Sequence, residues 1–494
     1  MNLARRLADV AARDPDRVAV EFEGARVPYA ALAERMLRFA GGLRERGVGP
    51  GDRMALHLPN GIEFVVAVWG ALAAGAVPTP MNPQLRRREI AHQLEDSGAR
   101  LLVTSAGDDA AREGAARTGV AVVEVGGTDG RAFDGIDGAP FLAERGDDDL
   151  ALMPYTSGTT GKAKGVLLTH GNLASNVRTM NALNGLAPDD HRMLVPLPMF
   201  HITGMTVMML APLLAGGTIF PLRSWDPAET LRMFGRHRIT ATVCVPTLLI
   251  DMLRVADEVD ADLSSVRFLF SGGAGLPVAV LEAFERRFEV EIQEGYGLSE
   301  TSPVTHANVA APRRKPGTVG WPIPGCEMRI VDPDGADVPL GDVGELWVRG
   351  PMVMKGYHGD PAATAAVLDG DGWFRTGDLA TRDAEGYVSI IDRKKDMILV
   401  GGLNVYPKEV EAVLHEHPAV RECAVTGAPD ERKGETVVAW VVPAGGRASD
   451  EALADELRRY CLDELAAYKH PRVVRFLDAL PRTASGKVRK FELR

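Results

Sequence analysis

Alternating helix-type and strand-type hydrophobic patterns are the feature that most limits the fold of this chain. Residues 29–46 carry apolar side chains at helical spacing and stop at Gly47, and residues 53–58 follow as a strand. Strands that alternate with helices assemble into a parallel sheet with helices on its faces. We therefore expect an α/β fold with parallel-rich sheets flanked by helices. The alternation continues with a helix at 63–74 and strands at 101–104, 120–125, 242–245 and 266–270.

The pattern changes beyond about residue 312, where short strands are separated by turns that contain glycine and proline. This texture predicts a small β subdomain at about 312–391, within a large N-terminal domain, residues 1–391. Residues 105–149 are rich in Ala, Gly and Asp, and we interpret them as a variable surface region. The remaining residues, 392–494, predict a small α+β domain with helices at 408–415 and 451–465 and strands at 423–425 and 437–442.

Composition and charge exclude several classes of protein. The 494 residues carry a formal net charge of −11, which argues against nucleic-acid binding. Two apolar stretches, residues 64–77 and 205–220, are shorter than the ~18 residues of a membrane-spanning helix, so we interpret them as core. No secretory signal is expected at the start, and the four cysteines include no CxxC pair, which is typical of reduced thiols. These features predict a cytoplasmic protein without a transmembrane segment.

A glycine-rich loop, residues 155–166 with the sequence YTSGTTGKAKGV, lies between two apolar runs that we interpret as strands. Its glycines let main-chain N–H groups approach a ligand closely, and its hydroxyls and lysines add donors and positive charge. The spacing differs from that of the ordinary P-loop, and Ala163 stands where a magnesium-binding hydroxyl would be. A flexible polar surface loop is the alternative. The ordered residues favour binding of a polyphosphate, with contacts expected from Thr156, Ser157, Gly158, Thr159, Thr160, Gly161 and Lys162.

This loop resembles the signature loop of the adenylate-forming superfamily, which includes acyl-CoA synthetases, luciferases and peptide-synthetase adenylation domains. Further motifs follow in the superfamily's order, and the resemblance covers essentially the whole chain. In residues 294–301, EGYGLSET, Tyr296 offers a ring for adenine, Ser299 a hydroxyl for phosphate and Glu300 an oxygen ligand for Mg²⁺. A strand-to-loop turn with an exposed glutamate is the alternative for this segment alone. The expected ATP/AMP site is completed by Gly273, Ala274, Glu294, Gly295 and Gly297.

Three more residues acquire expected roles from the resemblance. Asp378 lies in a Thr-Gly-Asp tripeptide, and its carboxylate can accept hydrogen bonds from both ribose hydroxyls, although most such tripeptides are surface turns. The resemblance implies that Lys487, in the motif PRTASGK, contacts the substrate carboxylate and the α-phosphate during adenylation. It also places His201 near the carboxylate pocket. Without the resemblance, a lone histidine would be interpreted as structural. We therefore expect Lys487, Glu300, Ser299 and His201 to be catalytic.

The charged run at residues 391–396 would ordinarily be a solvated linker. The resemblance implies that Asp392 is the hinge about which a mobile C-terminal domain rotates. It implies nucleotide contacts for Arg393 and Lys395. Gly401 and Gly402 match a loop that borders the pantetheine arm of coenzyme A when the thioester forms.

The reaction implied by the resemblance has two steps. The carboxylate attacks the α-phosphorus of Mg·ATP and gives an acyl-adenylate and pyrophosphate, and coenzyme A then accepts the acyl group. The expected cofactors are ATP, Mg²⁺ and coenzyme A, and a site of backbone amides and lysine without a protein nucleophile suits this chemistry. The expected partner is a small carboxylic acid, and the resemblance leaves a homodimer open.

The acid is expected to be a monocarboxylic acid with an apolar body. The expected pocket positions carry no Arg or Lys for a second carboxylate, and their small glycines are expected to leave space. The stretch EGYGLSETSPVTHAN looks most like medium- to long-chain fatty-acyl-CoA ligases, and an aryl acid such as a cinnamate or benzoate fits nearly as well. The expected acyl pocket consists of His201, Val245, Thr247, Gly272, Gly273, Gly297 and Val304.

Two alternatives from other classes stay open at the level of sequence. The enzyme could pass its acyl group to a carrier-protein thiol or another nucleophile instead of coenzyme A. A non-catalytic nucleotide- or lipid-binding relative is the other alternative. The presence of Glu300, Asp378, Arg393 and Lys487 argues against it, because a binding protein has no need of a mobile lysine.

Overall fold

The fold was examined in a computed structural model, which describes residues 2–126, 133, 135–156, 163–445, 447, 449–483 and 487–493. Within these residues, the largest sheet has nine strands in the order β16-β15-β14-β13-β12-β10-β11-β1-β2. In this order its strands from β14 to β1 run parallel, and antiparallel strands extend it at both ends. The strands are β1 Val18–Phe22, β2 Ala25–Pro28, β10 Arg192–Val195, β11 Thr218–Pro221, β12 Ala241–Cys244, β13 Phe268–Ser271, β14 Ile292–Gly297, β15 Val304–Ala307 and β16 Trp321–Pro322.

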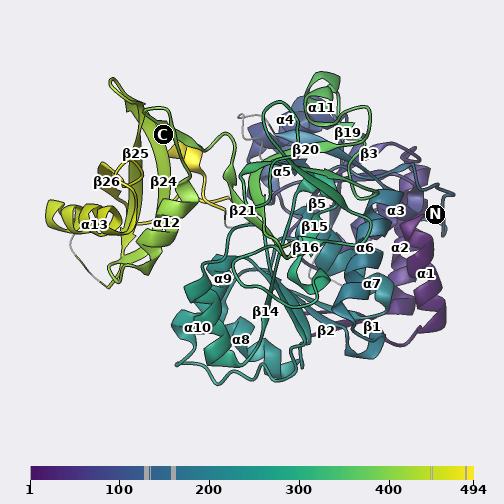
Figure 1. The fold of residues 1–494 in the computed structure, drawn as a ribbon. Helices are drawn as coiled ribbons and strands as arrows, with labels where there is room; N and C mark the ends of the chain where they lie inside the picture. The colour runs from purple at the N-terminus through teal and green to yellow at the C-terminus, as the bar shows by residue number, and fades with distance from the viewer. Residues whose placement is uncertain are drawn as a thin grey trace.

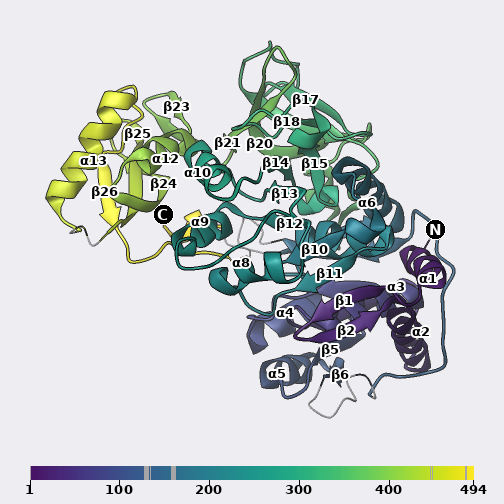
Figure 2. The same ribbon diagram turned by 90° about the horizontal axis from the view of Figure 1, so that it is seen from below.

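Helices pack on this sheet because its strands are apolar on both faces. The π-helix Thr203–Leu210 and α7 lie in the core, so the apolar stretch at 205–220 is buried as expected. The α-helices of this part are α6 His170–Asn184, α7 Ala211–Ala215, α8 Pro227–Arg236, α9 Pro246–Val255 and α10 Val278–Phe288. Figure 2 shows α8, α9 and α10 together on one side.

A second sheet, in the order β4-β3-β5-β6, is parallel throughout. Helix α3 is buried along residues 64–74 and packs closely on α2, because a Cβ at Gly70 would lie 2.4 Å from Cδ1 of Phe39. The elements are β3 Arg53–His57, β4 Val77–Pro80, β5 Leu101–Ser105, β6 Ala121–Val125, α1 Leu3–Arg13, α2 Tyr29–Glu45, α3 Ile62–Ala74, α4 Arg87–Ser97 and α5 Asp109–Thr118.

Helix α5 lies in the region that the sequence predicted to be variable surface with one strand. It buries only Ala111, Gly114 and Ala115, so it lacks the apolar stripe by which a helix is usually recognised. The side chain of Asp108 accepts a hydrogen bond from Ala111 N and caps its first turn. Local capping and small-residue packing against α4 therefore determine this helix.

The apolar runs on either side of the glycine-rich loop form strands β7 Leu150–Leu152 and β9 Lys164–Thr169, as the sequence predicted, and the first residues of the loop add a short strand, β8 Tyr155–Thr156, antiparallel to β9. Residues 157–162, which carry most of the predicted phosphate contacts, lie outside the described residues. Strand β9 also pairs with β7 Leu150–Leu152 and β19 Gly356–Tyr357. The base of the loop is thus held by strands from distant parts of the chain.

A small antiparallel sheet follows, in the order β17-β18-β20-β21. It begins at Glu327, later than the predicted start of the β subdomain near residue 312, because β16 pairs with β15 in the large sheet. Its last strand continues through Asp392 to Arg393, and the division of the chain at Asp392 stays a prediction. The elements are β17 Glu327–Val331, β18 Gly344–Arg349, β20 Phe374–Arg382, β21 Val388–Arg393 and helix α11 Pro361–Val367.

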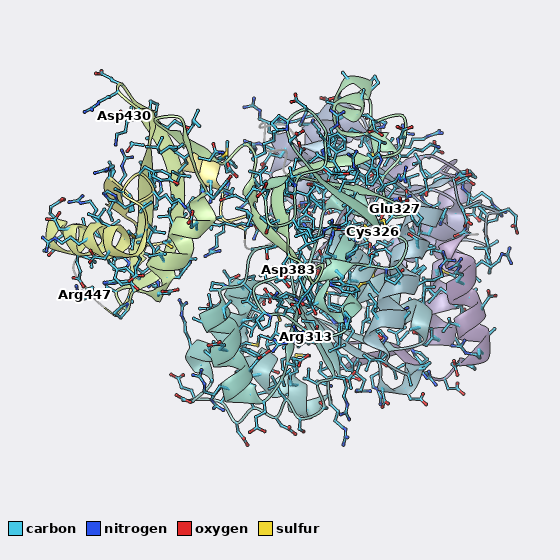
Figure 3. The ribbon with its side chains drawn as sticks, viewed as in Figure 1. Arg313, Cys326, Glu327, Asp383, Asp430 and Arg447 are labelled. Carbon is cyan, nitrogen blue, oxygen red and sulfur yellow. The ribbon has the colours of Figure 1, made fainter. Side chains whose placement is uncertain are left out.

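The C-terminal domain lies to one side of the large domain and follows β21 (Figures 1 and 2). A long hairpin, β24–β25, forms its centre, and Asp430 at the hairpin turn and Arg447 lie at different ends of the domain (Figure 3). Its elements are β22 Ile398–Val400, β23 Leu403–Val405, β24 Val420–Asp430, β25 Gly434–Pro443, β26 Val473–Phe476, α12 Pro407–Glu416 and α13 Glu451–Glu464. The α/β class with a large N-terminal and a small C-terminal domain is therefore confirmed.

The cysteines and the longest helices agree with the expectations from composition. All four cysteines are free thiols. Among the helices of the described residues, none combines the length and the apolar character needed to cross a membrane.

Candidate active site

Tyr296, Asp378 and Arg393 meet where the large sheet faces the β subdomain. The phenol of Tyr296, on β14, donates a hydrogen bond to Oδ2 of Asp378, on β20. Oδ1 of the same carboxylate lies 2.8 Å from Nε of Arg393, on β21, and Asp378 is almost fully buried. Burial and the neighbouring Asp378 raise the pKa of Tyr296 well above its usual value, so the phenol stays a donor. Three predicted nucleotide-binding residues are therefore assembled into one hydrogen-bonded group.

Glu300 lies in a short 3₁₀-helix, Ser299–Thr301, and is held by a residue that the sequence analysis missed. The phenol of Tyr357 donates a hydrogen bond of 2.8 Å to Oε1 of Glu300. The ammonium of Lys164, at the end of the glycine-rich loop, lies 4.8 Å from the centre of the Tyr357 ring. Tyr357 therefore contacts both the end of the glycine-rich loop, through Lys164, and the segment that carries Glu300.

The segment around Tyr357 also links these motifs through its backbone. Met354 N donates to Glu300 O at 2.8 Å, and His358 N donates to Gly165 O at the same distance. Gly356 has a φ of 148°, and a Cβ there would lie 2.9 Å from Cγ2 of Thr364, so this position favours glycine. The only signal in the sequence is a glycine and a tyrosine after the apolar residues 352–354, which is too common to be diagnostic.

Lys487 extends from the C-terminal tail into the large domain. A Cβ at Gly273, in the turn after β13, would lie 3.6 Å from Cε of Lys487. Burial, then the positive charge of Arg393, lowers the pKa of Lys487. Burial and the neighbouring Lys487 lower the pKa of His201 to about 3, so this imidazole is neutral. The structure thus brings Lys487, His201 and Gly273 together, and their roles stay predictions.

The glycines of β14 are packed more tightly than the sequence analysis expected. A Cβ at Gly295 would lie 2.0 Å from Cζ of Phe270, and a Cβ at Gly297 would lie 1.8 Å from O of Pro303. These positions do not open space toward the core, because a ring and a carbonyl already fill it. The expectation that small glycines leave space is therefore wrong for Gly295 and Gly297.

The remaining predicted pocket residues lie on neighbouring elements. Gly272 follows β13, and a Cβ there would lie 3.3 Å from O of Gly295. Cγ1 of Val245 would lie 3.6 Å from a Cβ at Gly273. Val304 is buried at the start of β15, Thr247 is half-buried in the first turn of α9, and Ala274 is exposed. Burial raises the pKa of Glu294 to about 7, and its carboxylate accepts a hydrogen bond of 2.9 Å from Gly317 N.

Gly401 and Gly402 form the turn between β22 and β23, apart from the nucleotide-site contacts. Both have positive φ, and a Cβ at either glycine would meet no heavy atom within 4 Å in the part of the chain that the structure describes. Gly401 N donates to Lys433 O, within the C-terminal domain. Lys395 borders a cavity of about 310 Å³ in the same domain, which Trp440 and Arg475 also line. Among the described residues, the hydrogen bonds of the predicted coenzyme A loop therefore lie within the C-terminal domain and not with the group assembled around Asp378.

Asp392 is buried at the junction of the two domains. Its oxygens accept hydrogen bonds from Arg393 N at 2.7 Å and Lys408 N at 2.9 Å. Nearby, Nζ of Lys490 lies 2.7 Å from Oε1 of Glu411, on α12. Although burial opposes it, the charges of Glu411 and Asp392 raise the pKa of Lys490. The tail is thus anchored to the junction three residues after Lys487.

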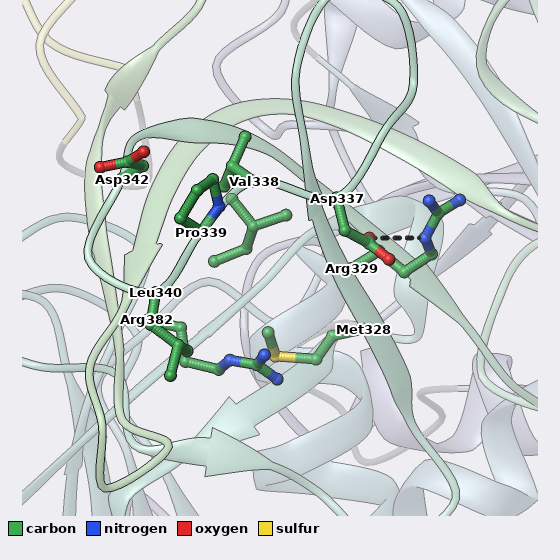
Figure 4. Close-up of a pocket in the computed structure, with 9 residues that line it drawn as sticks. Met328, Arg329, Asp337, Val338, Pro339, Leu340, Asp342 and Arg382 are labelled. Carbon is green, nitrogen blue, oxygen red and sulfur yellow. Dashed lines mark hydrogen bonds and ion pairs between the residues drawn. The ribbon is translucent and has the colours of Figure 1, made fainter.

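A shallow cavity in the β subdomain includes none of the predicted site residues. Its volume is about 200 Å³, and it lies between β17, residues 337–342 and Arg382 (Figure 4). An ion pair of 2.8 Å between Arg329 and Asp337 crosses one side of it. We assign it no function.

Comparison with known proteins agrees with this arrangement. A family model described as "AMP-binding enzyme" matches residues 7–358, and one described as "AMP-binding enzyme C-terminal domain" matches residues 409–487. Feruloyl-CoA synthase of an Amycolatopsis species is 41% identical over 97% of this chain and 96% of its own length. A long-chain-fatty-acid–CoA ligase of Bacillus subtilis is 35% identical over 98% of this chain and 92% of its own length.

A solved structure gives the same result. ATP-bound MatB from Rhodopseudomonas palustris superposes with a TM-score of 0.92 at 36% identity, covering 100% of this chain and 98% of that chain. Fold, site and comparisons together define an adenylate-forming enzyme of the acid–thiol ligase class. The chain belongs to the AMP-binding enzyme family, and the resemblance inferred from its motifs is confirmed.

Proposed function

We propose that this enzyme activates a carboxylic acid with Mg·ATP and transfers the acyl group to coenzyme A. A carboxylate oxygen attacks the α-phosphorus, and the bond to the bridging oxygen of pyrophosphate breaks. The coenzyme A sulfur then attacks the carbonyl carbon, and AMP leaves. The observation that carries the proposal is the position of Lys487, which is half-buried beside His201 and Gly273. A cation at this position can neutralise the charge that develops on the carboxylate and the phosphate.

The other residues have distinct roles in this proposal. Asp378 accepts hydrogen bonds from the ribose hydroxyls, and the ion pair with Arg393 orients its carboxylate. The ring of Tyr296 provides a face for adenine, and its phenol is fixed by Asp378. His201, which is neutral because of its lowered pKa, contacts the substrate carboxylate without adding a second positive charge beside Lys487.

The donor set around Glu300 fits a magnesium ion that is bound mainly by the nucleotide. Among the described residues, no cluster of three or more His, Cys, Asp or Glu side chains could hold a metal. One carboxylate is what Mg²⁺ commonly takes from a protein when phosphate oxygens and waters supply its other ligands. When bound, the ion offsets the negative charge of the leaving pyrophosphate. We propose that Glu300 is this ligand.

We propose further that the acid is an aryl acid of the hydroxycinnamate type. Phe270 and Pro303 fill the space that side chains at Gly295 and Gly297 would occupy, so we infer that β14 offers the acid a flat wall of backbone at these positions. A flat wall suits a planar acid better than a flexible chain. The 41% identity to feruloyl-CoA synthase supports this choice. The expected pocket positions carry no Arg or Lys, which argues against a dicarboxylic acid.

A medium- or long-chain fatty acid is the second candidate. The sequence around β14 favours it, and the B. subtilis relative that is 35% identical is named a long-chain-fatty-acid–CoA ligase. A fatty acid needs a deep apolar channel beyond β14. The two candidates therefore differ in the shape of the pocket that each requires.

The test is pyrophosphate release by the purified enzyme with Mg·ATP and a panel of acids. The panel contains ferulate, cinnamate, benzoate, octanoate, palmitate and malonate, each with and without coenzyme A. We expect repeated turnover only with coenzyme A, and the highest kcat/KM with ferulate or cinnamate. The Lys487→Ala variant provides the background rate for each acid.

The other outcomes have defined meanings. A preference for octanoate or palmitate would overturn the aryl proposal in favour of the second candidate. Turnover that is indifferent to coenzyme A would point to a carrier protein or another acceptor. Absence of pyrophosphate release with every acid would reject the proposed substrate classes.

A further inference from the structure

We propose that Tyr357 is a positioning residue that holds one oxygen of Glu300 so that the other faces the metal–nucleotide complex. The proposal rests on the proposed role of Glu300 as the magnesium ligand. It concerns a tyrosine that none of the motifs in the sequence singled out. Neither the attack of the acid on ATP nor the transfer of the acyl group to coenzyme A, as proposed here, involves this tyrosine.

The first observation is the unequal use of the two carboxylate oxygens of Glu300. Oε1 accepts the hydrogen bond of 2.8 Å from the Tyr357 phenol. Within the described part of the chain, no hydrogen bond or ion pair engages Oε2. A carboxylate with one oxygen committed to a neutral donor can offer the second as a single ligand to a cation. The hydrogen bond thereby prevents free rotation of the carboxylate.

The second observation is that Tyr357 is itself held on three sides. Its backbone pairs with Val166 of β9, and its N–H donates to Oγ1 of Thr364 at 2.9 Å. Lys164 lies over its ring at 4.8 Å. Because β9 holds Tyr357 in this way, the phenol keeps the Glu300 carboxylate in a fixed position relative to that strand.

The third observation is that the backbone around Tyr357 is hydrogen-bonded both to the base of the glycine-rich loop and to Glu300. Strand β9 begins at Lys164, directly after the loop, and His358 N donates to Gly165 O. Met354 N donates to the backbone oxygen of Glu300. The base of the loop and the metal ligand are therefore joined through residues 354–358, with Tyr357 as the side-chain link.

The phenol donates its hydrogen bond to the Glu300 carboxylate and is uncharged, so it adds no negative charge beside the phosphates. Phenylalanine at this position would keep the ring beneath Lys164 and remove only the hydrogen bond.

The test is metal binding in Tyr357→Phe, measured without turnover. Mn²⁺ is titrated by electron paramagnetic resonance into the enzyme saturated with α,β-methylene-ATP, which cannot be cleaved at the α-phosphorus. Because a hydrogen bond to a charged group is lost, we expect the Mn²⁺ dissociation constant to rise about tenfold. Pyrophosphate release should then need more Mg²⁺ for half-maximal rate, with most of kcat restored at saturating Mg²⁺.

Two variants serve as controls. Tyr387→Phe removes a phenol that donates to Arg313 O at 2.6 Å in the β subdomain, and it should leave Mn²⁺ binding unchanged. Glu300→Gln should weaken Mn²⁺ binding by itself, and adding Tyr357→Phe to it should weaken binding no further. The melting temperature of each variant reports whether it is folded.

Wild-type Mn²⁺ binding in Tyr357→Phe would overturn the proposal, as would an equal loss in Tyr387→Phe. An additive loss in the double variant would also overturn it, because Tyr357 would then act independently of Glu300. The readout separates this proposal from the proposed function. An enzyme that releases no pyrophosphate with any acid, yet loses Mn²⁺ affinity on Tyr357→Phe, would reject the function and retain the positioning role.

Discussion

Lys487 and Gly273 lie side by side although they belong to different domains, with 3.6 Å between Cε of the lysine and the position of a Cβ on the glycine. The glycine has a φ of 82°, and the turn that it forms after β13 leaves room for the lysine chain. The small domain therefore contributes a residue to a site that is otherwise built by the large domain. Several predictions about activity depend on this contact.

Replacement of Lys487 by alanine should slow pyrophosphate release by at least about 100-fold, as expected when a preorganised charge is removed from a transition state. ATP binding should persist, because Tyr296, Asp378 and Arg393 remain. The measurement is pyrophosphate release together with equilibrium ATP binding. Lys469→Ala, which removes a lysine paired with Glu409 in the same domain, is the control and should retain activity. Normal adenylation by Lys487→Ala would contradict the assigned role.

Removal of the anchor of the tail should weaken adenylation without removing Lys487. In Lys490→Met the ion pair with Glu411 is lost, and the tail is less firmly held at the domain junction. We expect about a tenfold slower pyrophosphate release, since misplacement of a charged group by a small distance has effects of this size or larger. The check is the single-turnover rate of adenylation.

The control for this prediction is the double variant Lys490→Met/Glu411→Gln. It lacks the unpaired carboxylate that the single variant leaves behind, so it should be the more stable of the two. Equal adenylation rates in wild type and Lys490→Met would show that the anchor has no effect on the position of Lys487.

Addition of a single methyl group at Gly295 should destabilise the large domain. The Cβ of Gly295→Ala would overlap the ring of Phe270, and overpacking of this kind costs about 1–3 kcal/mol. We expect a lower melting temperature by differential scanning calorimetry. Gly275→Ala is a matched control, because a Cβ there meets no heavy atom of the described residues within 4 Å. In the double variant Gly295→Ala/Phe270→Leu, the smaller side chain should restore part of the loss.

The stability of the protein should fall as the pH decreases from 7 to about 5. Burial lowers the pKa of His170 and of His191 to about 4 and that of His306 to about 3, below the value near 6.5 expected in the unfolded chain. The unfolded state therefore binds more protons between pH 6.5 and 4, and it is favoured as the pH falls. Each buried histidine should account for about 1 kcal/mol at pH 5.5.

The measurement is the midpoint of urea unfolding between pH 5 and 7.5. His191→Phe removes one of these titrating groups, and among the described residues neither ring nitrogen of His191 has a hydrogen-bond partner. The pH dependence of this variant should be shallower than that of the wild type. An unchanged slope would show that His191 does not titrate on unfolding.

Local patterns predicted the elements whose residues carry clear periodicity. The helix over residues 29–46 appears as α2, and the strands near 101 and 242 appear as β5 and β12, because their apolar residues face a core. Helix α5 was missed, since it buries only small residues and depends on the Asp108 cap. Local sequence carries little information about such packing.

The residues of the candidate site likewise fall into those that the sequence predicted and those that it did not. The motifs with glycines and charged residues in a fixed order indicated Tyr296, Asp378, Arg393 and Lys487, which the structure brings together. Tyr357 was not predicted, because its contacts with Glu300 and Lys164 join segments far apart in the sequence. The filling of the space beside Gly295 depends on the Phe270 ring from another strand, which no pattern around β14 reveals.

Asp378 and Arg393 form the last pair of the β20–β21 ladder, directly after the pair of Leu379 and Asp392. A rotation of the small domain about Asp392 would therefore move Arg393 away from Asp378, whereas Tyr296 would stay beside Asp378. A nucleotide that contacts both Asp378 and Arg393 binds more tightly to the domain orientation seen here. By thermodynamic reciprocity, the same nucleotide raises the population of that orientation by the same factor. With the proposed hinge at Asp392, nucleotide affinity and domain orientation would form a single coupled equilibrium, in which the departure of AMP would favour release of the small domain.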